Sequence, residues 1–274
     1  MSGVSQQLEF PSWIRAREIA TPLTTSFATA PEDSALAMAA LLRARQFDSA
    51  PVLAPDGAPV GVFRADNDGT FDDETPVSQV MAPLTAHLFV SGDTPLSTLM
   101  RRMSEEPFLF VLDDRGVIGF ITPADLGTVP VRSHFYLRLA HLESQLGDYL
   151  RDRFSDQTMA IAQLSPSRRE AQVRIAEDLR NKDTFVDDIA CLSLDDLVCI
   201  VGKDPAFREA TRQQGIGWRR ATKGIADFRN DVMHPARPFG DSTDARPGKL
   251  VEWEDSLRAL SRAATCLAHD SPIL

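Results

Sequence analysis

Several features are scarce in this chain, and each shortage argues against a class of function. Only 3 of its 274 residues are cysteine. Cys191, Cys199 and Cys266 lie in apolar, helical surroundings without metal-ligand spacing, so we expect buried, unpaired thiols in a reducing compartment. No set of His, Asp or Glu has the spacing of metal ligands either, which argues against a metal enzyme.

Long apolar runs and an N-terminal targeting pattern are also missing. No apolar run approaches the roughly 20 residues that span a bilayer, and residues 1–17 show no basic start followed by an apolar stretch. We therefore expect no membrane span, no signal peptide and a cytoplasmic location. The hydrophobic fraction of 43% and the charged fraction of 25% are typical of globular proteins, and the length suffices for two domains.

Basic residues are outnumbered, with 29 Lys and Arg against 39 Asp and Glu and a formal net charge of −10. Because phosphate affinity comes from Lys and Arg, this balance argues against a general nucleic-acid-binding protein. Most of the acidic excess lies before residue 131, and between residues 205 and 240 the balance reverses. The basic residues there are Arg208, Arg212, Arg219, Arg220, Lys223, Arg229 and Arg237. A solvated helix face would also explain them.

Two stretches of the first half repeat one pattern at a spacing of about 60 residues. Each has an expected strand, a capped helix and then a hairpin whose turn carries Asp and Gly. The turns fall at Asp56-Gly57 in the first copy and at Asp113 to Gly116 in the second. The apolar runs 50–54 and 108–112 are too short for helices. The repetition predicts two stacked copies that bury their apolar faces against each other.

The second copy ends in Gly119-Phe-Ile-Thr-Pro-Ala-Asp-Leu126, which resembles the Gly-apolar-apolar-Thr-x-x-Asp-apolar ending of CBS domains. The resemblance covers roughly residues 20–130. It implies an α+β tandem CBS sensor with copies at about 20–68 and 76–130, after an N-terminal segment 1–19. In that family the Thr and Asp hold the phosphate and ribose of an adenine nucleotide.

That role would fall to Thr122, as the N-cap of a short helix with Pro123 in its first position, and to Asp125 one turn later. A capping Thr followed by an acid needs no ligand, so a purely structural role stays open. The first copy departs from the pattern, since Arg64 replaces the Thr and Asn67 replaces the Asp. Arg64 could pair with a phosphate. We nevertheless expect that this copy has lost its ligand.

Residues 131–274 read as an all-helical domain without strand patterns. Ser133 is an expected N-cap, and the helix after it carries an apolar stripe of Leu139, Leu142, Leu146, Tyr149 and Leu150. Further helices are expected to begin at Ser167, with a capping box to Glu170, and at Ser193 and Pro205. A single helix over 218–233 and a closing helix over 251–268 complete the domain.

Arg229-Asn-Asp-Val-Met-His234 lies directly before Pro235, at the end of the expected 218–233 helix. Because the residue before a proline avoids the α region, the helix should stop near His234 and leave the imidazole exposed. A guanidinium, an amide and an imidazole could bind a phosphate and move a proton without a metal. The spacing and the Asn resemble the Arg-x4-His signature of HEPN domains, all-helical folds often found in metal-independent ribonucleases.

The HEPN resemblance implies RNA cleavage that leaves a 2′,3′-cyclic phosphate. His234 would take the 2′-hydroxyl proton, Arg229 would stabilise the phosphorane, and Asn230 would orient the imidazole or donate to a phosphate oxygen. One histidine cannot be base and acid at once, so we expect a homodimer, which is usual in the family. The expected RNA contacts are Arg219, Arg220, Lys223 and Arg237.

Structural explanations of the same residues stay open. An Arg near a helix C-terminus and a His before a Pro are ordinary capping choices. Glu143 on the first long helix resembles an acidic residue often seen in HEPN domains, but an exposed helical Glu would look the same. The other histidines, His87, His134, His141 and His269, are expected at the surface or in caps.

Together the two halves predict a nucleotide-regulated, metal-independent endoribonuclease of a stress or phage-defence system. The candidate regulatory ligands are AMP, ATP, S-adenosylmethionine and cyclic dinucleotides, and no cofactor is required. An antitoxin protein is a candidate partner. The alternative is a non-enzymatic CBS-containing regulator whose helical domain dimerises or binds a protein, which the net negative charge favours.

Overall fold

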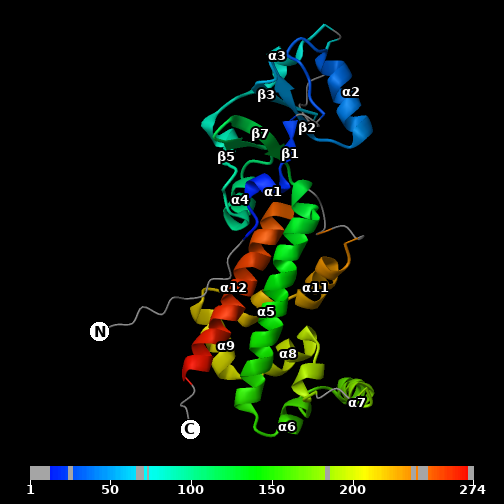
Figure 1. Ribbon diagram of the computed structural model, residues 1–274, viewed down its shortest axis with the longest axis vertical. Helices are drawn as coiled ribbons and strands as arrows, with labels where there is room; N and C mark the ends of the chain where they lie inside the picture. The colour runs from blue at the N-terminus through cyan, green and yellow to red at the C-terminus, as the bar shows by residue number, and fades with distance from the viewer. Residues whose placement is uncertain are drawn as a thin grey trace, which may run out of the picture. The chain divides into compact units, whose positions relative to one another are not determined.

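The computed structural model describes residues 13–23, 27–65, 71–72, 74–182, 186–235, 239 and 246–270 (Figure 1). They form two compact units. The first, here called the α/β unit, lies within residues 11–131 and 241–248. The second, here called the helical unit, lies within residues 132–240 and 249–274.

The α/β unit contains two small sheets. One sheet has the strand order β1-β7-β6-β5, and the other has the order β2-β3-β4. The strands are β1 (Thr21–Pro22), β2 (Ser49–Leu53), β3 (Pro59–Arg64), β4 (Ala82–Pro83), β5 (Phe89–Ser91), β6 (Leu109–Asp113) and β7 (Gly116–Ile121). The helices are α1 (Ala16–Ile19), α2 (Ala35–Arg45), α3 (Val77–Val80), α4 (Leu96–Met103) and the 3-10 helices η2 (Ala86–Leu88) and η3 (Asp125–Gly127).

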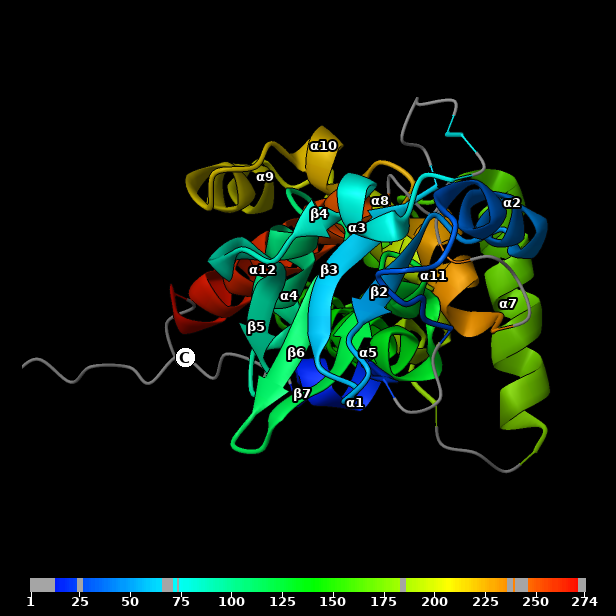
Figure 2. The ribbon, with the colours of Figure 1, turned by 90° about the horizontal axis from the view of Figure 1, so that it is seen from above.

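Both hairpins predicted from Asp-Gly turns are present. Strands β2 and β3 pair antiparallel, as do β6 and β7 (Figure 2). Gly57 and Gly116 have φ angles of 83° and 121°. Only glycine adopts such values readily, which is why these two turns contain it.

The two copies exchange their first short strands. β1, from the start of the first copy, pairs with β7 of the second, and β4, from the start of the second copy, pairs with β3 of the first. Gly119 and Gly61 permit the close approach. A Cβ at Gly119 would lie 2.5 Å from the Thr21 carbonyl oxygen, and one at Gly61 would lie 2.9 Å from that of Ala82.

A shared apolar core joins the copies. Val62 of the first copy belongs to the same buried cluster as Phe108, Phe110 and Phe120 of the second. The rings of Phe108 and Phe120 stack with centroids 5.0 Å apart. Burial of these apolar groups stabilises the pairing of the two copies.

The helical unit has no strand among its described residues, so the predicted fold class, α+β followed by all-α, is confirmed. Its helices are α5 (Val129–Arg153), α6 (Gln157–Ile161), α7 (Pro166–Arg180), η4 (Ile189–Cys191), α8 (Leu194–Val201), α9 (Pro205–Gln213), α10 (Trp218–Thr222), α11 (Ile225–Met233) and α12 (Arg246–Asp270). The first three residues of α5 and the first three of α12 belong to the α/β unit. The long helices α5 and α12 run side by side (Figure 1).

Four positions of the predicted stripe on α5 are buried, namely Leu139, Leu142, Leu146 and Leu150. An aromatic cluster lies beside them in the core. In it Phe228 on α11 contacts Phe135 on α5 and stacks on Trp253 of α12, with 4.5 Å between the last two ring centroids. This cluster attaches α11 to the two long helices.

Of three predicted helix starts, two differ from the structure and one is confirmed. Ser133 lies inside α5, which begins at Val129 and tolerates Pro130 because a first-turn residue needs no N–H bond. Helix α7 begins at Pro166 after the N-cap Ser165, not at Ser167, for the same reason. The start at Ser193 is confirmed, with a capping box to Asp196.

The expected single helix over 218–233 is wrong. It is divided into α10 and α11 at Gly224, whose φ of 78° is left-handed and cannot continue an α-helix.

Cys199 and Cys266 are exposed, so of the three expected buried thiols only Cys191 is buried. His134 is also not a surface residue, since it is 4% exposed inside the helical unit. The side chain of His269 falls outside the described residues.

Candidate functional sites

The Thr122 to Asp125 loop follows β7 directly. The Asp125 carboxylate accepts from the Thr122 backbone N–H at 2.7 Å and from the Thr122 hydroxyl at 2.9 Å, both at Oδ2. The short helix is the 3-10 turn Asp125–Gly127, so it begins later than the expected start at Pro123. Asp125 therefore accepts hydrogen bonds from Thr122, whereas Thr122 was expected to be the N-cap of the helix.

A third residue completes this cluster, and sequence reasoning did not find it. The hydroxyl of Thr21 on β1 donates to Asp125 Oδ1 at 3.0 Å. Burial raises the pKa of Asp125, although its bonds with Thr122 and Thr21 oppose that shift. Two hydroxyls and a half-buried carboxylate are thus brought together at one sheet end, a set that suits ribose hydroxyls and phosphate oxygens.

The corresponding position of the first copy is arranged differently. Arg64, at the end of β3, forms an ion pair of 2.5 Å with Glu106, which lies just before β6. Both side chains are mostly buried, with 33% and 25% of their surfaces exposed. Asn67 lies outside the described residues. Arg64, the residue expected to pair with a phosphate in this copy, thus already has a carboxylate partner.

The hexapeptide Arg229 to His234 forms the end of α11. The His234 backbone N–H donates to the Asn230 carbonyl at 3.1 Å, and the helix stops there, as expected from Pro235. Asn230 and His234 are exposed. The Arg229 side chain is 43% exposed and lies 4.0 Å from Glu143 of α5. Burial raises the pKa of Glu143, and the charge of Arg229 opposes the shift.

Arg132, another residue that sequence reasoning missed, holds this helix end. Its guanidinium donates to the Asp231 carbonyl at 2.5 Å and to the His234 carbonyl at 3.5 Å. It also lies over the Phe239 ring, with Cζ 4.6 Å from the ring centroid. Burial lowers the Arg132 pKa, and the charge of Asp231 opposes that effect. A buried arginine in the first turns of α5 therefore donates hydrogen bonds to the C-terminal carbonyls of α11.

The expected RNA contacts lie around α10. Arg219, Arg220 and Lys223 are all exposed. Arg237 lies outside the described residues. Three exposed cations precede the hexapeptide in the chain and leave positive charge available to solvent.

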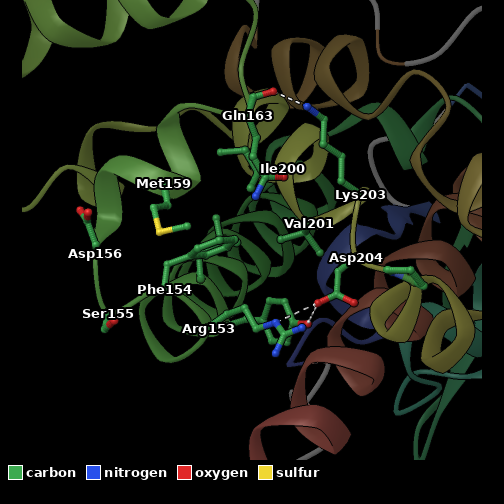
Figure 3. A pocket seen from close by; sticks show the side chains of 13 residues that line it. Arg153, Phe154, Ser155, Asp156, Met159, Gln163, Ile200, Val201, Lys203 and Asp204 are labelled. Carbon is green, nitrogen blue, oxygen red and sulfur yellow. Dashed lines mark hydrogen bonds and ion pairs between the residues drawn. The ribbon is translucent and has the colours of Figure 1, made fainter.

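A pocket of about 400 Å³ lies elsewhere on the helical unit, among α5, α6, α8 and the start of α9 (Figure 3). None of its lining residues belongs to the hexapeptide. Its polar groups bind one another, since Tyr149 donates to Asp204 at 2.7 Å and Arg153 lies 3.3 Å from the same carboxylate. Burial, reinforced by that hydrogen bond, raises the Tyr149 pKa. These internal pairs give the pocket wall a structural role.

Within the part of the chain that the structure describes, no three His, Cys, Asp or Glu residues are grouped so that they could hold a metal ion. No helix among those residues is both long and apolar enough to cross a membrane.

Comparison with known proteins identifies the family of one region. A model of the CBS domain matches residues 72–128, and no curated protein matches the chain. Similar solved structures include the CBS domain of a bacterial CNNM/CorC family Mg²⁺ transporter in complex with ATP, at 23% identity, over 42% of this chain and 85% of that one, with a TM-score of 0.37. CBSX2 in complex with AMP is similar at 23% identity, over 41% and 92%, with a TM-score of 0.35.

A hemolysin-like protein containing a CBS domain from Oenococcus oeni PSU is similar at 20% identity, over 41% of this chain and 87% of that one, with a TM-score of 0.35. The matched residues 72–128 include β4 to β7 and the Thr122 to Asp125 loop. The N-terminal α+β region of this chain therefore contains a CBS domain.

Proposed function

We propose that the α/β unit is a sensor that binds an adenine nucleotide at Thr21, Thr122 and Asp125. The carrying observation is the convergence of two hydroxyls on one half-buried carboxylate at the end of β7. Adenine nucleotides are the ligands that the CBS resemblance implies. Ribose hydroxyls would donate to the remaining lone pairs of Asp125, and the Thr122 hydroxyl would turn from Asp125 to donate to a phosphate oxygen.

Isothermal titration of the full chain with AMP and with ATP tests this sensor. Binding of either nucleotide that is lost in Asp125→Ala supports it. Equal affinity of the variant and the wild type would place the ligand elsewhere.

We further propose that the nucleotide regulates a HEPN-type, metal-independent endoribonuclease in the helical unit, working as a homodimer. His234 would remove the 2′-hydroxyl proton, the 2′-oxygen would attack phosphorus, and the 5′-oxygen would leave with a proton from the second subunit's histidine or from water. Arg229 would stabilise the phosphorane charge. The products are a 2′,3′-cyclic phosphate and a 5′-hydroxyl. Exposure of Asn230 and His234 beside a half-exposed Arg229 supports this assignment.

The alternative is a non-enzymatic regulator whose helical unit dimerises or binds a protein such as an antitoxin. One observation favours it: Arg229 lies 4.0 Å from Glu143, so its charge already has an internal partner. In that case the hexapeptide serves to end α11, and Arg132 serves to hold it.

RNA cleavage in EDTA separates the two functions. The full chain should cleave RNA without metal, and His234→Ala should reduce the rate about 100-fold or more without changing the melting temperature. His141→Ala is the matched control, because His141 is an exposed histidine on α5. Equal cleavage by wild type and His234→Ala would end the ribonuclease proposal, and absence of cleavage by every form would favour the regulator.

A further inference from the structure

Arg246, the first residue of α12, contacts the loop that contains the proposed nucleotide site. Its Nη1 donates to the Pro123 carbonyl at 3.0 Å and lies 3.3 Å from that of Ala124. Arg246 lies 123 positions after Pro123, yet it belongs to the same α/β unit. The C-terminal part of the chain thus adds a charged residue to the sensor.

Gly127 makes room for this guanidinium. A Cβ at Gly127 would lie 3.0 Å from Arg246 Nη1 and 3.4 Å from Cζ, closer than an ordinary van der Waals contact. Any side chain at position 127 would therefore press on Arg246. The glycine and the arginine form one fitted contact on the 3-10 turn that contains Asp125.

The direction of these bonds bears on the ligand. In a trans peptide the C=O and the next N–H point in opposite directions. Holding the Pro123 carbonyl toward Arg246 therefore directs the Ala124 N–H away from it, whereas the Asp125 N–H donates within the loop to the Thr122 carbonyl at 3.0 Å. A cation on the carbonyl side also polarises the peptide group and makes the Ala124 N–H a stronger donor.

We propose that Arg246 is a positioning residue of the nucleotide site and that the first turns of α12 register whether the site is occupied. The proposal rests on nucleotide binding at Thr122 and Asp125. A ligand that changes the conformation of the loop also moves the carbonyl groups to which Arg246 donates. Because Arg246 is the first residue of α12, that movement acts directly on the start of this helix. A ligand effect on α12 requires that the two loop states bind Arg246 differently.

The test is hydrogen exchange of the full chain with and without AMP, repeated with ATP. In the wild type, nucleotide should slow exchange in peptides covering 122–128 and 246–256. In Arg246→Met, affinity should fall about tenfold, in line with the loss of a charged hydrogen bond. At a saturating nucleotide concentration this variant should show protection at 122–128 alone.

Two further variants control for misfolding and for charge. Lys249→Met removes a cation from the same turns of α12 and should behave as the wild type. Gly127→Ala would place a methyl group 3.0 Å from Arg246 Nη1, so it should shift the guanidinium slightly and reduce affinity less than Arg246→Met does. If Arg246→Met keeps wild-type affinity and wild-type protection at 246–256, the proposal is overturned. If neither nucleotide protects 122–128 in the wild type, nucleotide binding itself fails, and the role of Arg246 fails with it.

Discussion

Thr21 donates a hydrogen bond of 3.0 Å to Asp125, a residue 104 positions later in the chain. The bond exists because β1 leaves its own copy and pairs with β7, which ends just before the Thr122 to Asp125 loop. Strand exchange thereby builds the candidate nucleotide site from both ends of the α/β region. Each part of the site can be tested separately.

Thr21→Val should weaken AMP binding several-fold, because it keeps the volume of the side chain but removes one donor to Asp125. Thr222→Val is the matched control, since that hydroxyl bonds to the Trp218 carbonyl within α10. Calorimetric titration measures both variants. Equal losses in the two would show that the effect is not specific to the site.

AMP affinity should also depend on the ionisation of Asp125. Ribose hydroxyls need the ionised carboxylate as acceptor, and burial raises its pKa above the ordinary value of 3.8. Affinity should therefore fall as the pH drops through that raised pKa. Asp125→Asn retains only the titration of AMP itself, so its affinity curve should lack this component. Parallel curves for variant and wild type would assign the titration to another group.

The wild type should bind one nucleotide per chain, because Arg64, at the corresponding position of the first copy, already forms an ion pair with Glu106. Glu106→Gln removes the competing charge and should reveal a second, weaker site in the titration. Glu105→Gln, which changes the adjacent exposed acid, should leave the stoichiometry at one. A single site in Glu106→Gln, or two sites in the wild type, would contradict this explanation.

A buried ion cluster should make the helical unit sensitive to acid. Glu254, 1% exposed, lies 3.0 Å from His134 Nε2 and accepts from Arg138 at 2.5 Å, with Arg258 3.6 Å away. Burial raises the Glu254 pKa, but the His134 bond and the charges of Arg138, His134 and Arg258 outweigh it, so its pKa is lowered. A lowered carboxyl pKa stabilises the fold above the unfolded pKa, and this stability is lost as the pH falls through the folded pKa.

Glu254→Gln should therefore lower the free energy of unfolding at neutral pH by about 3 kcal/mol, as expected for breaking a buried pair. The two proteins should converge in stability as the pH falls from the ordinary pKa of glutamate through the lowered pKa of folded Glu254. Glu252→Gln, on the exposed side of α12, should cost less than about 0.5 kcal/mol. Urea titrations over a range of pH give these values, and a difference that is constant with pH would rule out the linkage.

Arg132→Met should loosen the end of α11, because two carbonyls lose their donor. A hydrogen bond from a charged donor contributes roughly 1.5–3 kcal/mol, so amide exchange over residues 228–234 should accelerate. If the ribonuclease proposal holds, RNA cleavage should fall while RNA affinity is retained, and Arg132→Lys should recover part of the rate. Arg208→Met, at an exposed arginine of α9, is the control. Unchanged exchange in Arg132→Met would show that this contact does not hold the helix end.

Local patterns predicted much of the fold. The hairpin turns at Gly57 and Gly116, the helix start at Ser193 and the buried stripe of α5 all depend on residues close in the chain, so their signals are visible in the sequence. The end of α11 at His234 follows from Pro235 for the same reason. The prediction of a single helix over 218–233 was wrong because the sequence does not distinguish a glycine with a left-handed φ angle from one that is tolerated within a helix.

The sequence by itself determined the two-part α+β and all-α organisation, the CBS-type loop and the exposed position of His234 at the end of α11. Only the tertiary structure decided which distant groups meet: Thr21 with Asp125, Arg246 with the Pro123 carbonyl, Arg132 with the end of α11, and His134 with Glu254. Each of these pairs joins residues about a hundred or more positions apart. Short-range periodicity and capping rules carry no information at that separation, because such contacts are set by strand exchange and helix packing.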